Sequence, residues 1–301
     1  MKKIVITGSN GLLGQSLLKL LLKEKNNYEV YGFSKGENRS GRTDFNYVSI
    51  DITDEENLKK TLLKVKPDAI INTAAMTQVD DCEIYKETCD ILNIDVVKWL
   101  KETSEIINCH LIHLSTDFIF DGEKGYYRET DKANPLSYYG RSKVKSEEIL
   151  QESNIDFTII RTILVYGKVF DMSRTNIVLW VKEMLENGKE ITIVNDQFRM
   201  PTFVDDLALS CKLAVDKQAT GIFHISSTKL MSVFEIVQEI ANVFELDLNL
   251  IKPTSSHILN QKAKRPPKTG FDVSKAKSIL GINLQTFEED LRRFKDILSL
   301  N

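Results

Sequence analysis

Residues 2–14 read Lys-Lys-Ile-Val-Ile-Thr-Gly-Ser-Asn-Gly-Leu-Leu-Gly, an apolar run that passes into a turn containing three glycines. The run up to Thr7 is apolar and β-branched, which is typical of a strand buried on both faces of a sheet. From Leu12 to Lys25, leucines recur at the spacing of one helix face. The amino terminus of such a helix favours a bound anion, because its N–H groups are free and its dipole is positive there. This stretch therefore predicts a strand, a phosphate-binding turn and a helix in direct succession.

The three glycines of this turn have different predicted tasks. Gly8 permits the tight turn, Gly11 lets the backbone approach a pyrophosphate, and Gly14 lets the helix pack closely on the sheet. An ordinary strand–helix turn can also carry glycines, but this spacing in this position is typical of a dinucleotide-binding turn. The predicted cofactor-binding residues here are Gly8, Asn10, Gly11, Leu12 and Gly14.

Short apolar runs and amphipathic segments alternate through the first half of the chain. The apolar runs lie at residues 29–34, 47–51, 69–72, 110–115 and 155–162, and the helical patterns at 54–64, 85–107 and 137–151. Such alternation is typical of a parallel sheet covered by helices on both faces. We therefore predict an α/β fold, a Rossmann-type doubly wound parallel sheet, with the site along the carboxyl ends of its strands.

The alternation loosens beyond residue 165, where residues 252–270 form a predicted loop rich in Pro and Lys. We expect a Rossmann domain at residues 1–165, with contributions from about 189–225. Residues 166–188 and 226–301 are expected to form a smaller, interleaved carboxy-terminal lobe that binds the substrate.

Composition narrows the class of protein. The 301 residues carry a formal charge of −3, so no basic excess predicts a nucleic-acid partner. No apolar run approaches the ~18 residues that a membrane helix needs. The four cysteines show no metal-ligand spacing, and we predict no metal. The expected protein is cytoplasmic, without a membrane or nucleic-acid partner, and a homodimer is compatible with the sequence.

The end of the second predicted strand bears on cofactor choice. An acidic residue there would bind the ribose 2′-hydroxyl of NADH, but the sequence has Ser34 and Lys35, with Arg39 and Arg42 nearby. A hydroxyl and basic groups suit a 2′-phosphate, which favours NADPH and leaves NADH open. An ordinary solvated loop can carry the same charges. We predict that Ser34 and Lys35 bind the cofactor.

Tyr139 and Lys143 stand four residues apart on one predicted helix, so their side chains share a face. A phenol has a pKa near 10, and a neighbouring ammonium lowers that pKa toward the working range. Thr116, at the end of a predicted strand, offers a hydroxyl for the substrate oxygen. Combined with the glycine turn, these three residues form a predicted catalytic set.

These motifs resemble the extended short-chain dehydrogenase/reductase family, and within it the dTDP-4-dehydrorhamnose reductases. The resemblance covers nearly the whole chain. It rests on the three glycines and on residues 72–80, 115–122, 134–143, 195–197 and 199–202. It implies reduction of the C4 keto group of a nucleotide-linked deoxysugar, namely dTDP-4-dehydrorhamnose to dTDP-rhamnose in the synthesis of cell-surface polysaccharide precursors.

The resemblance also implies roles for individual residues. Tyr139 would donate the proton, Lys143 would bind the nicotinamide ribose, and Thr116 would hold the sugar oxygen. The implied cofactor contacts are Asp51, Ile52, Ala74, Ala75, Thr77, Asn93, Tyr139 and Lys143. The implied substrate contacts are Val79, Thr116, Asp117, Leu164 and Arg265, although the Arg265 loop also reads as a solvated charge run. The family's reductases carry a Trp where this chain has Leu164, which leaves the precise sugar open.

Three other functions share this pattern. A 4,6-dehydratase needs an acidic residue after Asp117, where this chain has Phe118. A C4 epimerase needs no such residue and stays open, but it recycles its cofactor instead of consuming it. Some relatives are regulatory, cofactor-binding subunits of methionine adenosyltransferase, and the intact catalytic set favours an enzyme over that alternative.

Overall fold

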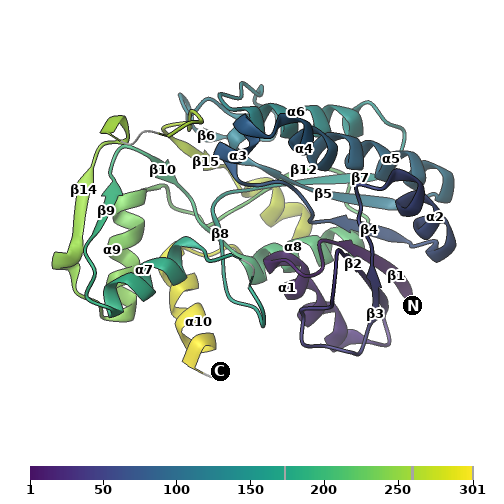
Figure 1. Cartoon of the computed structure of the whole chain (residues 1–301), viewed down its shortest axis with the longest axis horizontal. Helices are drawn as coiled ribbons and strands as arrows, with labels where there is room; N and C mark the ends of the chain where they lie inside the picture. The colour runs from purple at the N-terminus through teal and green to yellow at the C-terminus, as the bar shows by residue number, and fades with distance from the viewer. Residues whose placement is uncertain (173, 259–260, 300–301) are drawn as a thin grey trace.

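The computed structural model describes residues 1–172, 174–258 and 261–299. Its centre is a seven-stranded sheet in the order β12-β7-β5-β4-β1-β2-β3, in which every neighbouring pair is parallel (Figure 1). The strands are β1 (Lys2–Thr7), β2 (Tyr28–Ser34), β3 (Asn46–Ser49), β4 (Ala69–Asn72), β5 (His110–Thr116), β7 (Phe157–Thr162) and β12 (Gly221–Ile225). The strand order reverses between β1 and β4, which confirms the predicted Rossmann-type, doubly wound sheet.

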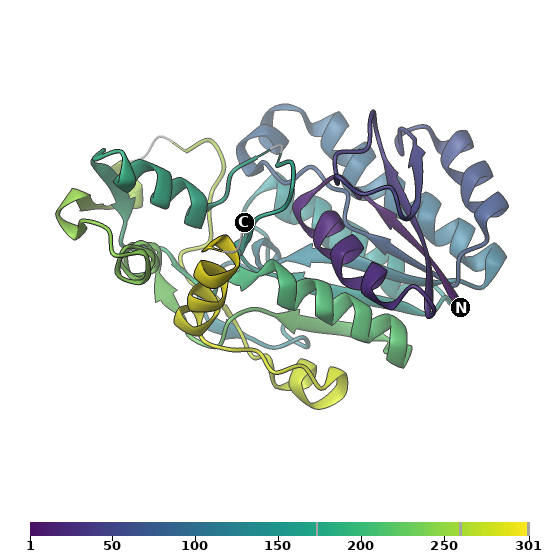
Figure 2. The same cartoon turned by 90° about the horizontal axis from the view of Figure 1, so that it is seen from below.

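Helices cover both faces of this sheet (Figures 1 and 2). One face carries α1 (Leu12–Leu21) and α8 (Val204–Lys217), and the other carries α2 (Glu55–Val65), α5 (Val96–Ile107) and α6 (Tyr138–Gln151). Side chains of β1 alternate between these layers. Ile4 and Ile6 share a core with Leu17 of α1, whereas Val5 shares the opposite core with Leu100 of α5. Burial on both faces explains why the strand reads as a continuous apolar run.

The segment predicted as one helix at 85–107 contains three elements. They are α4 (Lys86–Asp90), a π-helical stretch (Ile91–Asp95) and α5, and α3 (Val79–Ile84) precedes them. The remaining short helices lie at Leu22–Glu24, Asp117–Ile119, Leu248–Leu250, Ser256–Ile258 and Ala276–Leu280. No helix among residues 1–172, 174–258 and 261–299 is long and apolar enough to cross a membrane.

A smaller lobe, at the left in Figure 1, has its own apolar core. Its helices are α7 (Ile177–Glu186), α9 (Val233–Phe244) and α10 (Phe287–Ser299). Within the predicted contribution from 189–225, β12 joins the main sheet, whereas β9 (Ile191–Val194) pairs with β14 (Ile251–Thr254) in the lobe. The predicted domain limits themselves stay a prediction.

Three further short strand pairs link segments of the described chain that lie far apart in the sequence. They are β8 (Val165–Tyr166) with β11 (Thr202–Phe203), β10 (Phe198–Arg199) with β13 (Met231–Ser232), and β6 (Gly125–Tyr127) with β15 (Thr269–Phe271). The sequence predicts one long loop at residues 252–270, but most of β14 and the start of β15 fall within this range, and residues 259 and 260 lie outside the described residues. Their pairing partners lie far away in sequence, so local pattern could not reveal these strands.

Two buried carboxylates share one guanidinium where α8 meets α10. Arg293 donates to Asp290 at 2.7 Å and to Asp206 at 3.0 Å, and the two acids are 2% and 5% exposed. Burial, and then the negative charge of Asp206, raises the pKa of Asp290 above its ordinary value. A raised pKa in the folded state gives a stability contribution that is complete below about pH 4 and lost as pH rises through that raised pKa.

Asp290→Asn should therefore raise the melting temperature, and the gain should grow from pH 5 to pH 8. The amide removes the repulsion from Asp206 while its oxygen still accepts from Arg293. Differential scanning calorimetry of the variant and the parent at both pH values measures the effect. Glu288→Gln, which alters an exposed acid of the same helix, should show no such trend. A gain that is equal at both pH values would contradict the assignment.

Candidate active site

One cavity of about 1140 Å³ lies at the carboxyl ends of the central strands and extends to the smaller lobe. Residues from β2, β5 and β7 line it, together with Asn176 and Ile177 at the start of α7. This edge of a doubly wound sheet is where ligands bind in such folds. The predicted residues that line this cavity are Gly8, Asn10, Gly11, Leu12, Ser34, Lys35, Asp51, Ile52, Ala74, Ala75, Thr77, Val79, Thr116, Asp117, Tyr139, Lys143, Leu164 and Arg265.

Two residues predicted to bind the cofactor do not line the cavity. Gly14 lies behind the turn, where an added Cβ would come within 2.3 Å of the Gly8 carbonyl oxygen. Asn93, in the π-helical stretch, is buried and bonds both the N–H and the carbonyl of Met76, at 2.9 and 3.1 Å. Both therefore shape segments that line the cavity, namely the glycine turn and the loop after β4.

The glycine turn has the geometry that its sequence predicts. Gly8 has a φ of +68°, in the left-handed region that favours glycine, and the Gly11 N–H donates to its carbonyl at 2.8 Å. Helix α1 begins at this turn with no side-chain cap and no acidic residue in its first turn, within the described part of the chain. Its amino-terminal N–H groups and dipole thus suit an anion from the cavity.

The basic residues after β2 do not all reach the cavity. Lys35 lines it and pairs with Asp51 at 2.8 Å, and this hydrogen bond is the main reason that the pKa of Asp51 falls to about 2. Arg42 is paired with Asp44 at 2.6 Å, and the Arg39 guanidinium lies 3.8 Å from Asp171. Of the three predicted cations, Lys35 alone lines the described cavity.

Thr116 and Tyr139 are brought together by the turn after β5 and the start of α6. The hydroxyl of Thr116 donates to Asp117 Oδ1 at 3.1 Å and accepts from the Phe118 N–H at 3.2 Å. The Phe118 ring packs edge-on against the Tyr139 ring, with centroids 5.9 Å apart. Ser137 caps α6 by accepting from the Gly140 N–H, which fixes where this helix begins.

Gly140 was not predicted as a site residue, but it allows α6 to lie close to the turn after β5. A Cβ at this position would lie 2.2 Å from the Phe118 carbonyl oxygen, so only glycine lets α6 pack so closely on the turn. A glycine inside the first turn of a helix, directly after a candidate catalytic Tyr139, is the signal that could have identified it.

The prediction that Lys143 lowers the pKa of Tyr139 toward the working range is wrong. Burial is the largest influence on the phenol and raises the pKa of Tyr139 well above its ordinary value, although a hydrogen bond to Thr116 opposes it. Lys143 is 1% exposed, its ammonium nitrogen lies 2.9 Å from His113 Nε2, and burial lowers its pKa to about 8. At neutral pH the phenol of Tyr139 is thus protonated, and the amine of Lys143 is mostly charged.

The predicted substrate residues all line the cavity. Asp117 is buried, accepts from Thr269 at 2.5 Å and lies 3.7 Å from the Arg199 guanidinium. Arg265 is paired with Asp80 at 2.7 Å. Leu164 has a φ of +42°, which is strained for leucine, and its side chain lines the cavity.

Arg199 and Arg174 also line this cavity and were not predicted as site residues. Arg199 lies in the stretch 199–202 on which the family resemblance rests, and Arg174 lies in a segment without a clear pattern. In the described residues, no three His, Cys, Asp or Glu side chains are grouped so as to hold a metal ion.

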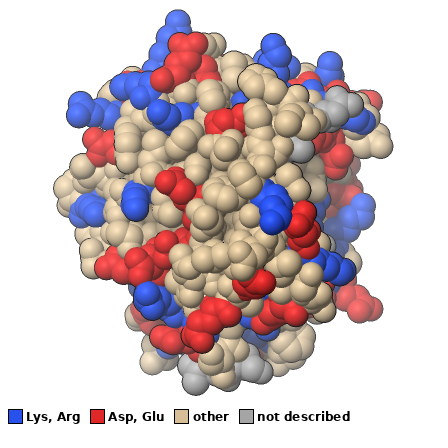
Figure 3. Space-filling view, turned by 90° about the vertical axis from the view of Figure 1, so that its left-hand side faces the viewer, with Lys and Arg blue, Asp and Glu red and all other residues tan. Residues whose placement is uncertain are grey.

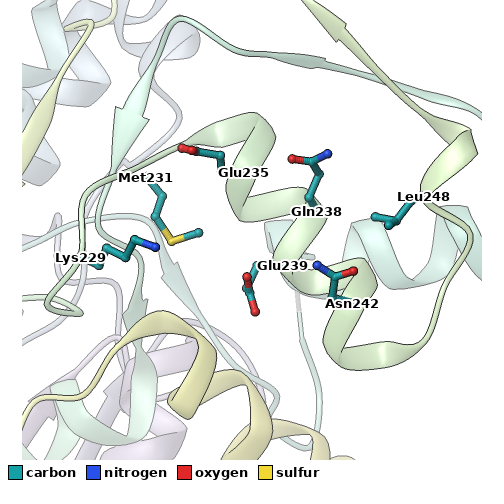
Figure 4. A pocket seen from close by; sticks show the side chains of 7 residues that line it. All are labelled: Lys229, Met231, Glu235, Gln238, Glu239, Asn242 and Leu248. Carbon is teal, nitrogen blue, oxygen red and sulfur yellow. The ribbon is translucent and has the colours of Figure 1, made fainter.

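A second depression, of about 280 Å³, lies along α9 and contains none of the predicted residues (Figure 4). Its lining residues are Lys229, Met231, Glu235, Gln238, Glu239, Asn242 and Leu248. The side of the molecule at the left in Figure 1 mixes acidic and basic side chains, without a broad region of one sign among its described residues (Figure 3). The large cavity is therefore the better candidate for an active site.

The sequence matches one protein family and is similar to several known proteins over most of its length. The family described as RmlD substrate binding domain matches residues 1–299. The "Probable low-salt glycan biosynthesis reductase Agl14" of Haloferax volcanii is 32% identical over 288 residues, 95% of each chain. Subunit beta of methionine adenosyltransferase 2 from Bos taurus is 29% identical, covering 95% of this chain and 84% of that protein.

A solved structure extends the similarity to three dimensions. The dTDP-4-dehydrorhamnose reductase of Bacillus anthracis, in complex with NADP, superposes with a TM-score of 0.87 at 28% identity. The match covers 98% of this chain and 99% of that one. The family match spans nearly all of the sequence, and the chain belongs to the RmlD substrate-binding-domain family.

Proposed function

We propose that this protein reduces the C4 keto group of a nucleotide-linked deoxysugar, dTDP-4-dehydrorhamnose, with a reduced nicotinamide cofactor. One observation carries the proposal: a single cavity joins the glycine turn to Thr116, Tyr139 and Lys143. The similarity to a dTDP-4-dehydrorhamnose reductase in complex with NADP supports it. The homodimer and the cytoplasmic location also stay predictions.

The residues that line the cavity fit such a cofactor. The uncapped amino terminus of α1 suits its pyrophosphate, and Lys143 lies within the same cavity to bind the nicotinamide ribose. When bound, the cofactor supplies the hydride that adds to the C4 carbon. When the cofactor and the sugar together fill the cavity, they displace water from the reacting atoms.

Reduction of a ketone places negative charge on the carbonyl oxygen, and Tyr139 is the proposed proton donor. Its raised pKa keeps the phenol protonated at neutral pH, which a donor requires. Thr116 would orient the same oxygen through its hydroxyl. Lys143, one helical turn along α6, would help to stabilise the phenolate that remains after proton transfer, although burial dominates the pKa of Tyr139.

NADPH should bind more tightly than NADH, and Lys35→Ala should reduce that preference about fivefold. An exposed charge pair contributes up to roughly 1 kcal/mol, and 1.4 kcal/mol corresponds to a factor of ten. Removal of Lys35 also takes away the cation that pairs with Asp51, and the uncompensated carboxylate would repel a 2′-phosphate. Isothermal titration calorimetry with both cofactors measures the ratio.

Arg42→Ala is the control for this prediction. Arg42 is paired with Asp44 and does not line the cavity, so the NADPH to NADH ratio should stay unchanged. Tighter binding of NADH than of NADPH by the parent protein would contradict the predicted cofactor preference.

No loss of water from nucleotide hexoses is expected. Elimination needs an acidic group after Asp117, and Phe118 occupies that position with its ring against Tyr139. Mass spectrometry of the products from dTDP-glucose checks this prediction. A product lighter by one water would show dehydratase chemistry and overturn the proposed reaction class.

The proposed function is tested by oxidation of NADPH against a panel of nucleotide-4-keto sugars. A reductase consumes one cofactor per product, whereas an epimerase converts the sugar without net consumption. The similarity to methionine adenosyltransferase 2 subunit beta favours a second candidate, a cofactor-binding regulatory subunit. Stable capture of a methionine adenosyltransferase catalytic subunit, with no turnover across the panel, would support that candidate instead.

A further inference from the structure

A chain of buried polar side chains crosses the centre of the sheet and ends at Lys143. The Thr7 hydroxyl lies 2.6 Å from the side-chain oxygen of Asn72, and the Asn72 amide nitrogen lies 3.1 Å from His113 Nδ1. His113 Nε2 then lies 2.9 Å from Lys143 Nζ. All four residues are at most 1% exposed, and they come from β1, β4, β5 and α6.

His113 is the hydrogen-bond partner of the lysine in this arrangement. Among the described residues, no carboxylate lies within ion-pair distance of Lys143, and its side chain bonds to no group other than His113 Nε2. Glu147, one turn further along α6, favours the charged lysine, but its carboxylate is held by Arg161 at 2.6 Å. Cys89 of α4 acts in the same direction on the lysine.

We propose that His113, held by Asn72 and Thr7, is a positioning residue that keeps the Lys143 ammonium charged and directed into the cavity. An ammonium has no acceptor, so a charged lysine must donate to Nε2 of a neutral imidazole. The imidazole proton then resides on Nδ1 and is donated to the Asn72 amide. The structure places the Asn72 nitrogen toward Nδ1 and its oxygen toward Thr7, so this proton arrangement requires the amide oxygen and nitrogen to exchange places. In the exchanged orientation the Asn72 oxygen accepts from Nδ1, and the Thr7 hydroxyl accepts from the Asn72 nitrogen.

The surroundings of His113 keep it available as an acceptor. Burial, and then the charge of Lys143, lowers the pKa of His113 well below its ordinary value, so the ring is neutral at physiological pH. The groups that face the ring are Asn72 of β4, and Lys143 and Ser146 of α6, whose hydroxyl lies 3.1 Å from Nε2. Without this acceptor, Lys143 would lose its one direct stabilising contact, and burial would favour its uncharged form.

This inference rests on the proposed function for its kinetic readout, but binding of NADPH tests it without turnover. In the parent protein, the affinity for NADPH should fall as pH rises past the pKa of Lys143, about 8. His113→Leu should move that midpoint down by roughly one pH unit, because a hydrogen bond to a charged group is lost. His113→Gln should move it by less, since its amide oxygen can accept from the lysine.

The experiment is calorimetric titration of NADPH from pH 6 to pH 9, paired with kcat/KM profiles on the confirmed sugar. His110→Leu is the matched control, because His110 is a second buried histidine of β5 that bonds to Thr158 and not to Lys143. Its midpoint should equal that of the parent. Asn72→Leu, which removes the support of the ring, should shift the midpoint in the same direction as His113→Leu.

Equal midpoints in the parent, His113→Leu and Asn72→Leu would overturn the inference, and so would equal shifts in His113→Leu and His113→Gln. If His113→Leu does not fold, Asn72→Leu replaces it in the comparison. Midpoints equal to that of the parent in both Asn72→Leu and His113→Gln would then overturn the inference. Shifted binding midpoints in a protein that reduces no nucleotide sugar would uphold the inference and contradict the proposed function.

Discussion

Tyr139→Phe is expected to lower kcat by about 10²–10⁴-fold, the usual contribution of general acid catalysis. The change removes one hydroxyl and preserves the ring, so its edge-on packing against Phe118 should remain. Folding and NADPH affinity should therefore be close to those of the parent. Steady-state kinetics with the confirmed sugar, together with a thermal melt and a calorimetric titration, measures all three properties.

Tyr138→Phe is the matched control, since it removes the hydroxyl of the preceding tyrosine, which bonds to Asp90 at 2.8 Å. Its kcat should stay within a few-fold of the parent value. Lys143→Ala should reduce kcat at least as much as Tyr139→Phe and should also weaken NADPH binding. Full activity of a folded Tyr139→Phe protein would remove Tyr139 from the mechanism.

Gly11→Val is expected to abolish calorimetrically detectable binding of NADPH and NADH while the fold survives. Gly11 has an extended backbone, with φ −79° and ψ 173°, which valine adopts readily. Its added Cβ would meet only the Gly8 carbonyl oxygen, at 3.2 Å, whereas the rest of the side chain would enter the space where the pyrophosphate approaches α1.

Gly14→Val is the comparison variant, because it should destabilise the fold, whereas Gly11→Val should abolish binding and leave the fold intact. A Cβ at Gly14 would lie 2.6 Å from Ser9 Cα as well as against the Gly8 carbonyl, so this change should lower the melting temperature. Gly11→Ala, with its smaller side chain, should weaken binding less than Gly11→Val. Normal NADPH binding by a folded Gly11→Val protein would show that the pyrophosphate lies elsewhere.

The glycine turn and the parallel sheet could be predicted because both depend on local pattern. Strands buried on two faces appear in the sequence as apolar runs. Gly8 has a positive φ, a conformation that glycine adopts more readily than other residues. Tyr139 and Lys143 share a helix, so their spacing alone predicts that they lie on one face.

The groups that control this site were harder to predict because they depend on contacts between distant segments. Gly140 matters through the carbonyl of Phe118, and His113 through Asn72 and Lys143. Spacing also suggested that the lysine governs Tyr139, but the extent of burial, which raises the pKa of the phenol, follows from the packing of the whole fold.

The most direct test is transfer of deuterium to dTDP-4-dehydrorhamnose from NADPH in which both hydrogens at the nicotinamide C4 position are replaced by deuterium. The account predicts one deuterium on C4 of the sugar product for each cofactor oxidised, seen by mass spectrometry and proton NMR. The Tyr139→Phe protein should form the same labelled product at a rate lower by about 10²–10⁴-fold. A sugar product without deuterium, or no oxidation of NADPH by the folded parent protein, would contradict the proposed reduction.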